Sequence, residues 1–177
     1  MLTSAVAQDI AYEVDGWGSD KYPNALLGVV ALMRQTFIDA NWYKTASETI
    51  NQFQQLNEPL KKNRDLEIIS HWIQGQYPFI FETNHELTIL RSFNIADEFQ
   101  LNMWLKGSGY EYRRVSEIAA ENPFIILPLN FPVTPDISDP YQALSYSTSE
   151  LKHWDMAPDN PAVLIDNNIA IALTGMV

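Results

Sequence analysis

The residues best placed for chemistry stand at the ends of short apolar runs in the middle of the chain. Glu82, Thr83 and Asn84 end the run PFIFETN, and Lys106 ends the run LNMWLK. In parallel α/β sheets, ligand-binding and catalytic side chains lie where strands end and loops begin. A carboxylate and an ammonium on neighbouring strand ends can also pair with each other. These strand ends are therefore where the sequence predicts a functional site.

A repeated strand-then-helix pattern positions these residues. The apolar runs PFIFET, LNMWLK and PFIILP begin near residues 78, 101 and 123, so the unit repeats about every two dozen residues. A helix-length stretch follows each of the first two runs. This alternation predicts βαβ units and an α/β fold with a parallel sheet. IAIALT near the end of the chain supplies a fourth strand candidate.

The first part of the chain predicts irregular structure and then helices. Residues 1–22 have glycines and aspartates without a period, which predicts an irregular N-terminal arm. From Pro23 an apolar stripe predicts a first helix closed by Trp42 and Tyr43, and a polar stretch predicts a second, more exposed helix that ends at or before Pro59. The stripe consists of Leu26, Leu27, Val30, Met33, Phe37 and Ala40.

Two later segments have clear local signals. Apolar residues spaced over 66–73 predict a further helix, which Gly75 stops. Residues 130–147 contain three prolines and no period, which predicts a long loop on the active-site face of a parallel barrel. Ser147 or Thr148 is suited to cap the helix that follows.

Several segments together resemble a known family. PFIFETNHELTILRSFNIADEF, then LNMWLKGSGYEYRRVSEIAAENPFIILPLNFP, then HWDMAPDNPAVLIDNNIAIALTG are similar to the second half of the barrel of a metal-dependent amidohydrolase of the imidazolonepropionase-like kind. NALLGVVALMRQTFIDANWY resembles a helix that those proteins carry well after their first barrel strand. The resemblance implies a partial TIM-type (β/α) barrel over residues 23–177, with four parallel strands and helices on the outer face. A complete barrel needs about 250 residues.

The resemblance also implies a metal site from which this sequence departs. Enzymes of the superfamily hold one or two divalent metals with a His-x-His pair on the first strand, a His at the end of the fifth, a His at the end of the sixth and an Asp at the end of the eighth. The metal lowers the pKa of a bound water and the Asp moves its proton. This sequence has no His-x-His, and the other positions match Glu82, Lys106 and either Gly175 or Met176. A charged ammonium has no lone pair for a cation.

Two functions follow from these departures. The first is an amidohydrolase-like, non-catalytic domain with a degenerate metal site, no cofactor and a structural or ligand-binding role, in which Glu82 pairs with Lys106 and the catalytic residues are unknown. The alternative is a hydrolase of cyclic amide or peptide-like C–N bonds, whose divalent metal, such as zinc, is completed by residues outside this chain. His85, three residues after Glu82, is a weak alternative ligand, because two ligands without a third hold metal weakly.

Charge and composition limit the kinds of molecule that the chain is expected to bind. The net charge of −11 comes from 22 acidic and 11 basic residues without a basic stripe, which argues against nucleic acid and anionic membranes. The chain has no cysteine, so disulfides, thiolate catalysis and Cys-based zinc sites are excluded. No apolar run approaches the roughly 18 residues of a membrane span, and the first residues lack the features of a signal peptide. The sequence predicts a soluble chain and does not indicate its compartment.

The predicted half-barrel needs a partner or a cover. Its inner face and its two sheet edges are costly to leave in water. We therefore expect a homodimer, or the missing barrel half of a longer parent protein, to cover them, in preference to an inward-folded arm or loop. The alternating apolar residues that line one or the other face are Phe79, Phe81, Leu101, Met103, Leu105, Phe124 and Ile126.

Two other motifs leave alternatives open. The run from Gly107 to Gly109 is either an anion-binding loop at a helix start or the tight turn that feeds the helix. Arg113 and Arg114 either bind a carboxylate or balance the charges of Glu111 and Glu117.

Overall fold

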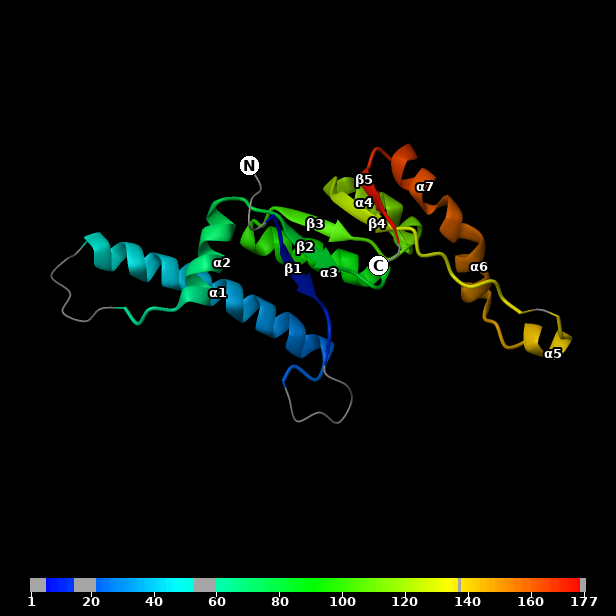
Figure 1. Cartoon of the computed structure of the whole chain (residues 1–177), viewed down its shortest axis with the longest axis horizontal. Coiled ribbons are helices and arrows are strands. Elements are labelled where there is room, and N and C mark those ends of the chain that lie inside the picture. The colour runs from blue at the N-terminus through cyan, green and yellow to red at the C-terminus, as the bar shows by residue number, and fades with distance from the viewer. Residues whose placement is uncertain (1–5, 15–21, 53–59, 137, 176–177) are drawn as a thin grey trace. The chain divides into compact units, whose positions relative to one another are not determined.

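The computed structural model describes residues 6–14, 22–52, 60–136 and 138–175 (Figure 1). The chain divides into two compact units. The first unit combines residues 1–79 with 95–102, and the second combines 80–94 with 103–177. None of the helices in these described ranges is long and apolar enough to cross a membrane.

The strands of the described residues form one parallel sheet in chain order, as the sequence predicts, but there are five of them instead of four. They are β1 (Gln8–Ala11), β2 (Phe79–Glu82), β3 (Met103–Lys106), β4 (Phe124–Pro128) and β5 (Ala170–Thr174). The additional strand, β1, lies in the segment expected to be irregular. Its four residues show no alternation of buried and exposed side chains, and it is held by backbone pairing, in which Gln8 N donates to Pro78 O at 3.0 Å. A strand of this kind gives no periodic signal.

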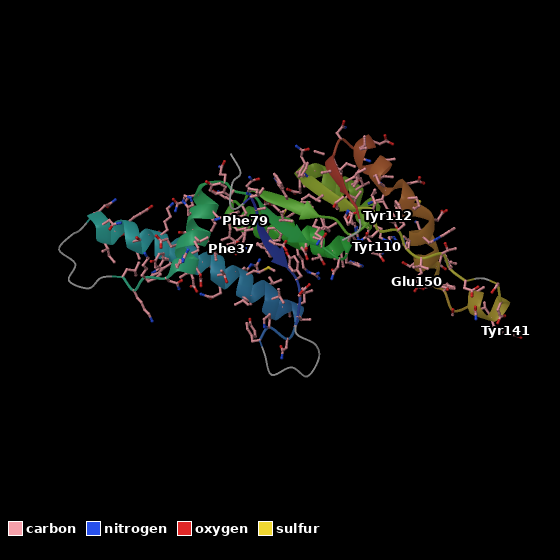
Figure 2. The ribbon with its side chains drawn as sticks, viewed as in Figure 1. Phe37, Phe79, Tyr110, Tyr112, Tyr141 and Glu150 are labelled. Atoms are coloured by element: carbon pink, nitrogen blue, oxygen red, sulfur yellow. The ribbon has the colours of Figure 1, made fainter. Side chains whose placement is uncertain are left out.

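The first unit is built around helix α1 (Leu26–Gln52) and helix α2 (Arg64–Gln74). Phe37 of α1, only 4% exposed, packs its ring against Phe79 at 5.8 Å and Phe99 at 5.1 Å between centroids (Figure 2). Trp72 of α2 reaches the same Phe79 ring at 6.2 Å. The side chain of Asn63 caps α2 by accepting hydrogen bonds from the first turn. An aromatic cluster therefore joins the two helices to the start of β2.

The prediction of two helices before residue 59 is wrong, because α1 runs without a break from Leu26 to Gln52. No proline or glycine interrupts the stretch after Tyr43, and the hydroxyls of Thr45 and Thr49 donate to backbone carbonyls one turn earlier, so nothing ends the helix there. The predicted end at Pro59 lies outside the described residues. Helix α1 also starts later than predicted, at Leu26, so Pro23 lies before its first turn.

The predicted apolar face of α1 is only partly correct. Phe37 and Ala40 are buried as expected, but Leu27 is 84% exposed and Val29 and Tyr43 are buried in its place. The apolar residues at the start of α1 occur on more than one side, so spacing alone does not identify the packed face.

The second unit contains β2 to β5 and the helices that follow these strands. These are α3 (Glu86–Phe99), which ends in the first unit, η1 (Glu111–Arg114), α4 (Val115–Glu121), α5 (Pro140–Ala143), α6 (Thr148–Met156), η2 (Ala157–Asp159) and α7 (Asn160–Asp166). Ser147 forms a capping box with Glu150 at the start of α6, as the sequence predicts. Residues 129–136 carry no helix or strand, which agrees with the predicted loop over 130–147. The short helix α5 lies in the later part of that predicted loop.

The register of the strands separates two faces of the sheet in the second unit. Leu105 lies opposite Ile125, and both are 0% exposed, so this face is covered by helices. Trp104 lies opposite Phe124, with ring centroids 5.0 Å apart, and this pair is half-buried on the other face. The covered core of this unit comprises Phe81, Ile89, Leu105, Ile118, Ile125, Leu127 and Leu164.

Truncation of Phe37 tests the aromatic cluster. We expect Phe37→Ala to lower the free energy of unfolding by about 3–5 kcal/mol, because it removes a buried ring and leaves a cavity. Urea denaturation followed by circular dichroism measures this loss. Trp42→Ala in the same helix is the control, because Trp42 is 61% exposed, and it should cost less than about 1 kcal/mol. Equal losses from the two substitutions would contradict the assigned helix face.

Candidate functional site

The ends of β2 and β3 carry an ion pair. Nζ of Lys106 contacts Oε1 of Glu82, which confirms the contact predicted from the sequence. The side chains are 48% and 30% exposed, respectively, so water screens the pair. Ion pairs with such exposure stabilise a fold by about 0–1 kcal/mol. The pair therefore brings two opposite charges together at the ends of β2 and β3 and contributes little to the stability of the fold.

Thr83 and Asn84 build the turn from β2 into α3. Thr83 donates from its backbone N and from Oγ1 to the carbonyl of Lys106, at 3.1 and 2.8 Å. Asn84 accepts a hydrogen bond from the hydroxyl of Thr88 at 3.2 Å. These contacts tie the ends of the two strands together beside the ion pair. Both residues thus have structural partners in this turn.

His85 faces Glu86. Its Nε2 lies 3.2 Å from Oε2 of Glu86, within reach of an electrostatic contact when the imidazole is protonated. The same Oε2 is buried and receives no hydrogen bond of good geometry from any described residue. The contact is therefore one of charge and distance rather than an aligned hydrogen bond. Within the described ranges, no three His, Asp or Glu side chains are grouped so that they could hold a metal ion.

Two residues at the end of β5 were matched to a metal ligand of the amidohydrolases in the sequence analysis. Gly175 follows this strand and has open space where a Cβ would lie. Met176, the other residue matched to this position, lies outside the described residues.

The loop after β3 does bind an anion, but the anion is the protein's own Glu111. This side chain is 0% exposed, and its carboxylate accepts hydrogen bonds from the backbone N of Ser108 at 2.5 Å and of Gly109 at 3.0 Å. Asn160 of α7 donates a further bond from Nδ2 at 2.7 Å and accepts one at Oδ1 from Tyr112 N. Buried carboxylates need such donors. The loop is thus both the tight turn and a closed internal anion site.

Glycine is required at two positions of this loop. A Cβ on Gly107 would lie 2.9 Å from Oε1 of Glu111 and 2.9 Å from Cδ1 of Leu127, which leaves no room for it. Gly109 has a φ of 89°, a backbone conformation that favours glycine. The two glycines let the backbone close around the carboxylate.

Arg113 does not balance Glu111, contrary to one of the two alternatives, because the Glu111 carboxylate is bonded to the loop and to Asn160. Its guanidinium lies over the ring of Tyr110, 4.6 Å from the centroid. Nε donates to the hydroxyl of Tyr112 at 3.3 Å and Nη2 donates to Oγ of Ser149 at 3.2 Å, while Nη1 is 3.5 Å from Glu86. Arg114 does balance Glu117, as that alternative proposed, at 3.0 Å.

His153 of α6 completes an aromatic stack in the second unit. Its imidazole lies flat on the ring of Tyr110, with centroids 3.8 Å apart and planes inclined by 14°. Nδ1 is 3.4 Å from the hydroxyl of Tyr112. Burial and the charge of Arg113 lower the pKa of His153 below its ordinary value, against the opposing charges of Glu111 and Glu86. This lowered pKa favours the neutral form of the imidazole.

A cleft of about 370 Å³ opens beside the stack. The loops that follow β2, β3 and β4 each contribute to its wall, as does α6. Its lining residues are His85, Tyr110, Arg113, Pro132, Val133, Pro135, Tyr146, Ser149, Glu150, His153 and Trp154.

The sequence missed the two features that organise this region. Glu111 and Asn160 are far apart in the chain, and neither stands at a strand end, so no local pattern marks them as partners. No local pattern marks His153, because its stacking on Tyr110 depends on the packing of α6. Only the glycines of the loop after β3 gave a signal, which left open an anion-binding loop or a tight turn.

Comparisons with known proteins agree with the fold. No family model matches the sequence, and no curated protein matches it significantly. The crystal structure of an amidohydrolase from Thermotoga maritima MSB8 matches with a TM-score of 0.70 at 18% sequence identity. The match covers 98% of this chain and 42% of that chain. The chain therefore has an amidohydrolase-like fold that corresponds to a partial barrel, and it spans about two fifths of the length of that protein.

Loss of the Glu111 charge tests the internal anion site. We expect Glu111→Gln to lower the free energy of unfolding by about 1–3 kcal/mol, because the amide turns an NH₂ group toward backbone donors that need an acceptor. Denaturant titration measures the loss. Glu117→Gln, an exposed and isosteric control, should change stability by less than about 0.5 kcal/mol. A neutral effect of Glu111→Gln would contradict the assigned network.

Proposed function

We propose that this chain is a non-catalytic amidohydrolase-like domain whose strand ends carry an ion pair where the enzymes of that superfamily carry metal ligands. The observation that carries this proposal is the contact between Lys106 and Glu82 at the carboxyl ends of β3 and β2. Its role is structural or ligand-binding, and no metal cofactor is part of it.

The donor set at these strand ends does not fit a divalent metal. The Glu82 carboxylate is engaged by an ammonium, which offers a cation no lone pair and repels it. His85, the weak alternative ligand, is directed toward Glu86, and Gly175 provides no side-chain donor at the end of β5. A metal such as zinc takes three or four good ligands. Each charge of the pair is compensated by the other, so the site needs no cation.

A second candidate function is hydrolysis of cyclic amide or peptide-like C–N bonds. The likeness to a Thermotoga amidohydrolase favours it, and it requires metal ligands supplied from outside this chain. In that case Lys106 would have to leave Glu82 or lose its proton when the metal binds. Metal analysis separates the two functions.

Zinc content tests the proposal. After incubation with zinc and exhaustive dialysis, we expect less than about 0.1 zinc per chain, because the strand ends lack a third ligand. Inductively coupled plasma mass spectrometry measures the content. Glu82→Gln is the matched variant, and it should leave the content unchanged. Stoichiometric zinc that disappears in Glu82→Gln would favour the hydrolase.

We also propose that the half-exposed face of the sheet in the second unit is covered by a second copy of the chain. Trp104, Phe124 and Ile126 are half-buried there, on the face opposite the helix-covered core. A two-fold dimer is the commonest way for a protein to cover such a surface. Further barrel strands would cover the same face in a longer protein.

Light scattering tests the dimer. At micromolar concentration we expect a particle of twice the chain mass of 20.2 kDa. Trp104→Gln should shift the mass toward the monomer, because it places an amide in the apolar contact. Trp42→Gln, on an exposed position of α1, is the control and should leave the mass unchanged. A single species of 20.2 kDa for the unsubstituted chain would contradict the proposal.

A further inference from the structure

The cleft beside the Tyr110–His153 stack combines one cation with an apolar wall. Arg113, at the turn after β3, supplies the cation, and its side chain is 24% exposed. The wall comes from the loop after β4 and from α6, with Pro132, Val133 and Trp154 among its residues. Trp154 is 41% exposed and Val133 is 91% exposed, so these apolar surfaces face solvent.

The guanidinium of Arg113 is fixed in orientation by largely neutral groups. Tyr110 supports one face of it, and the hydroxyls of Tyr112 and Ser149 each accept one hydrogen bond. A guanidinium has five N–H donors in a rigid fork that suits a carboxylate. Burial lowers the pKa of Arg113, but the hydrogen bond to Tyr112 and the contact with the Glu86 carboxylate outweigh it and raise the pKa above its ordinary value, so the group stays charged.

The acidic groups around the cleft leave room for an anion. Glu86 approaches Arg113 only to 3.5 Å, which is longer than a well-formed charged hydrogen bond. The Glu150 carboxylate is directed to Ser147, from which it accepts two hydrogen bonds of 2.7 Å at the start of α6. The lowered pKa of His153 favours its neutral form, so the proposed anion is assigned to Arg113. Among the residues that line the cleft, Arg113 therefore supplies the cation and Glu150 a carboxylate that is already bonded to Ser147.

We propose that this cleft binds a small organic acid with a planar ring, whose carboxylate pairs with Arg113 and whose ring lies against Trp154 and the proline-bearing loop of residues 132–135. A volume of about 370 Å³ suits a ligand of this size. The location agrees with the rule that ligands of α/β sheets bind beyond the carboxyl ends of the strands. The proposed ligand specifies the ligand-binding role that we propose for this domain. The cleft includes neither Glu82 nor Lys106, so binding there does not depend on whether a metal binds at the strand ends.

The test uses 4-fluorobenzoate as the probe and fluorine NMR titration of the full chain. We expect saturable binding with a dissociation constant of about 1 mM or tighter. 4-Fluorobenzyl alcohol, which has the ring without the charge, should bind at least about tenfold more weakly. Absence of binding by the acid, or equal binding by the alcohol, would overturn the proposal.

Neighbouring arginines provide matched variants. Arg113→Gln should weaken binding of 4-fluorobenzoate by about tenfold or more, because it removes the charged fork. Arg114→Gln, adjacent in the chain but paired with Glu117, should bind like the unsubstituted chain. Equal effects of the two substitutions would assign the binding to general charge and overturn the proposal. Near-ultraviolet circular dichroism checks that each variant is folded.

A second pair of variants, at Val133, tests whether the acid binds in the cleft if Arg113→Gln does not fold. Val133 is almost fully exposed, so polar substitutions there should not disturb the fold. Val133→Asp places a carboxylate in the cleft and should weaken the binding of 4-fluorobenzoate several-fold relative to the isosteric Val133→Asn. Equal affinities of the two variants would show that the acid binds elsewhere and would overturn the proposal.

Discussion

The parallel order of the strands is the constraint on which the site depends. Because β2 and β3 run in the same direction, the residues that end them meet at one edge of the sheet. Thr83 fixes the offset of the two strands by donating twice to the carbonyl of Lys106. Glu82 and Lys106 then lie side by side, and their opposite charges form a pair in this register. A shift by one residue would direct them to opposite faces.

A second, buried interaction organises the loops above this edge. The Glu111 carboxylate accepts hydrogen bonds from the loop after β3 and from Asn160 of α7, so a single charge joins two segments that are distant in sequence. The same Asn160 receives the backbone N–H of Tyr112. These contacts fix η1, and with it the positions of Tyr110 and Arg113 beside α6. The cleft therefore depends on a charge that does not face it.

Local patterns in the sequence were sufficient to predict four of the strands and the residues at two of their ends. Apolar runs, the first two of them followed by helix-length stretches, identified β2, β3, β4 and β5. The positions of Glu82 and Lys106 at two strand ends led to the prediction of their pairing. Strand β1 was missed because four residues held by backbone pairing show no alternation. The partners of Arg113 were also missed, since Glu86 and Ser149 lie far from it in the chain and reach it only through packing. Side-chain contacts of this kind depend on the fold as a whole.

We propose that Lys106 occupies the place that a metal has at the corresponding strand end of the amidohydrolases. A crystal structure of the chain grown with zinc present tests it most directly. We expect electron density for Nζ of Lys106 against the Glu82 carboxylate and no ordered metal at this position. An ordered zinc ion on Glu82 with tetrahedral ligation, and Lys106 turned away from it, would contradict the claim.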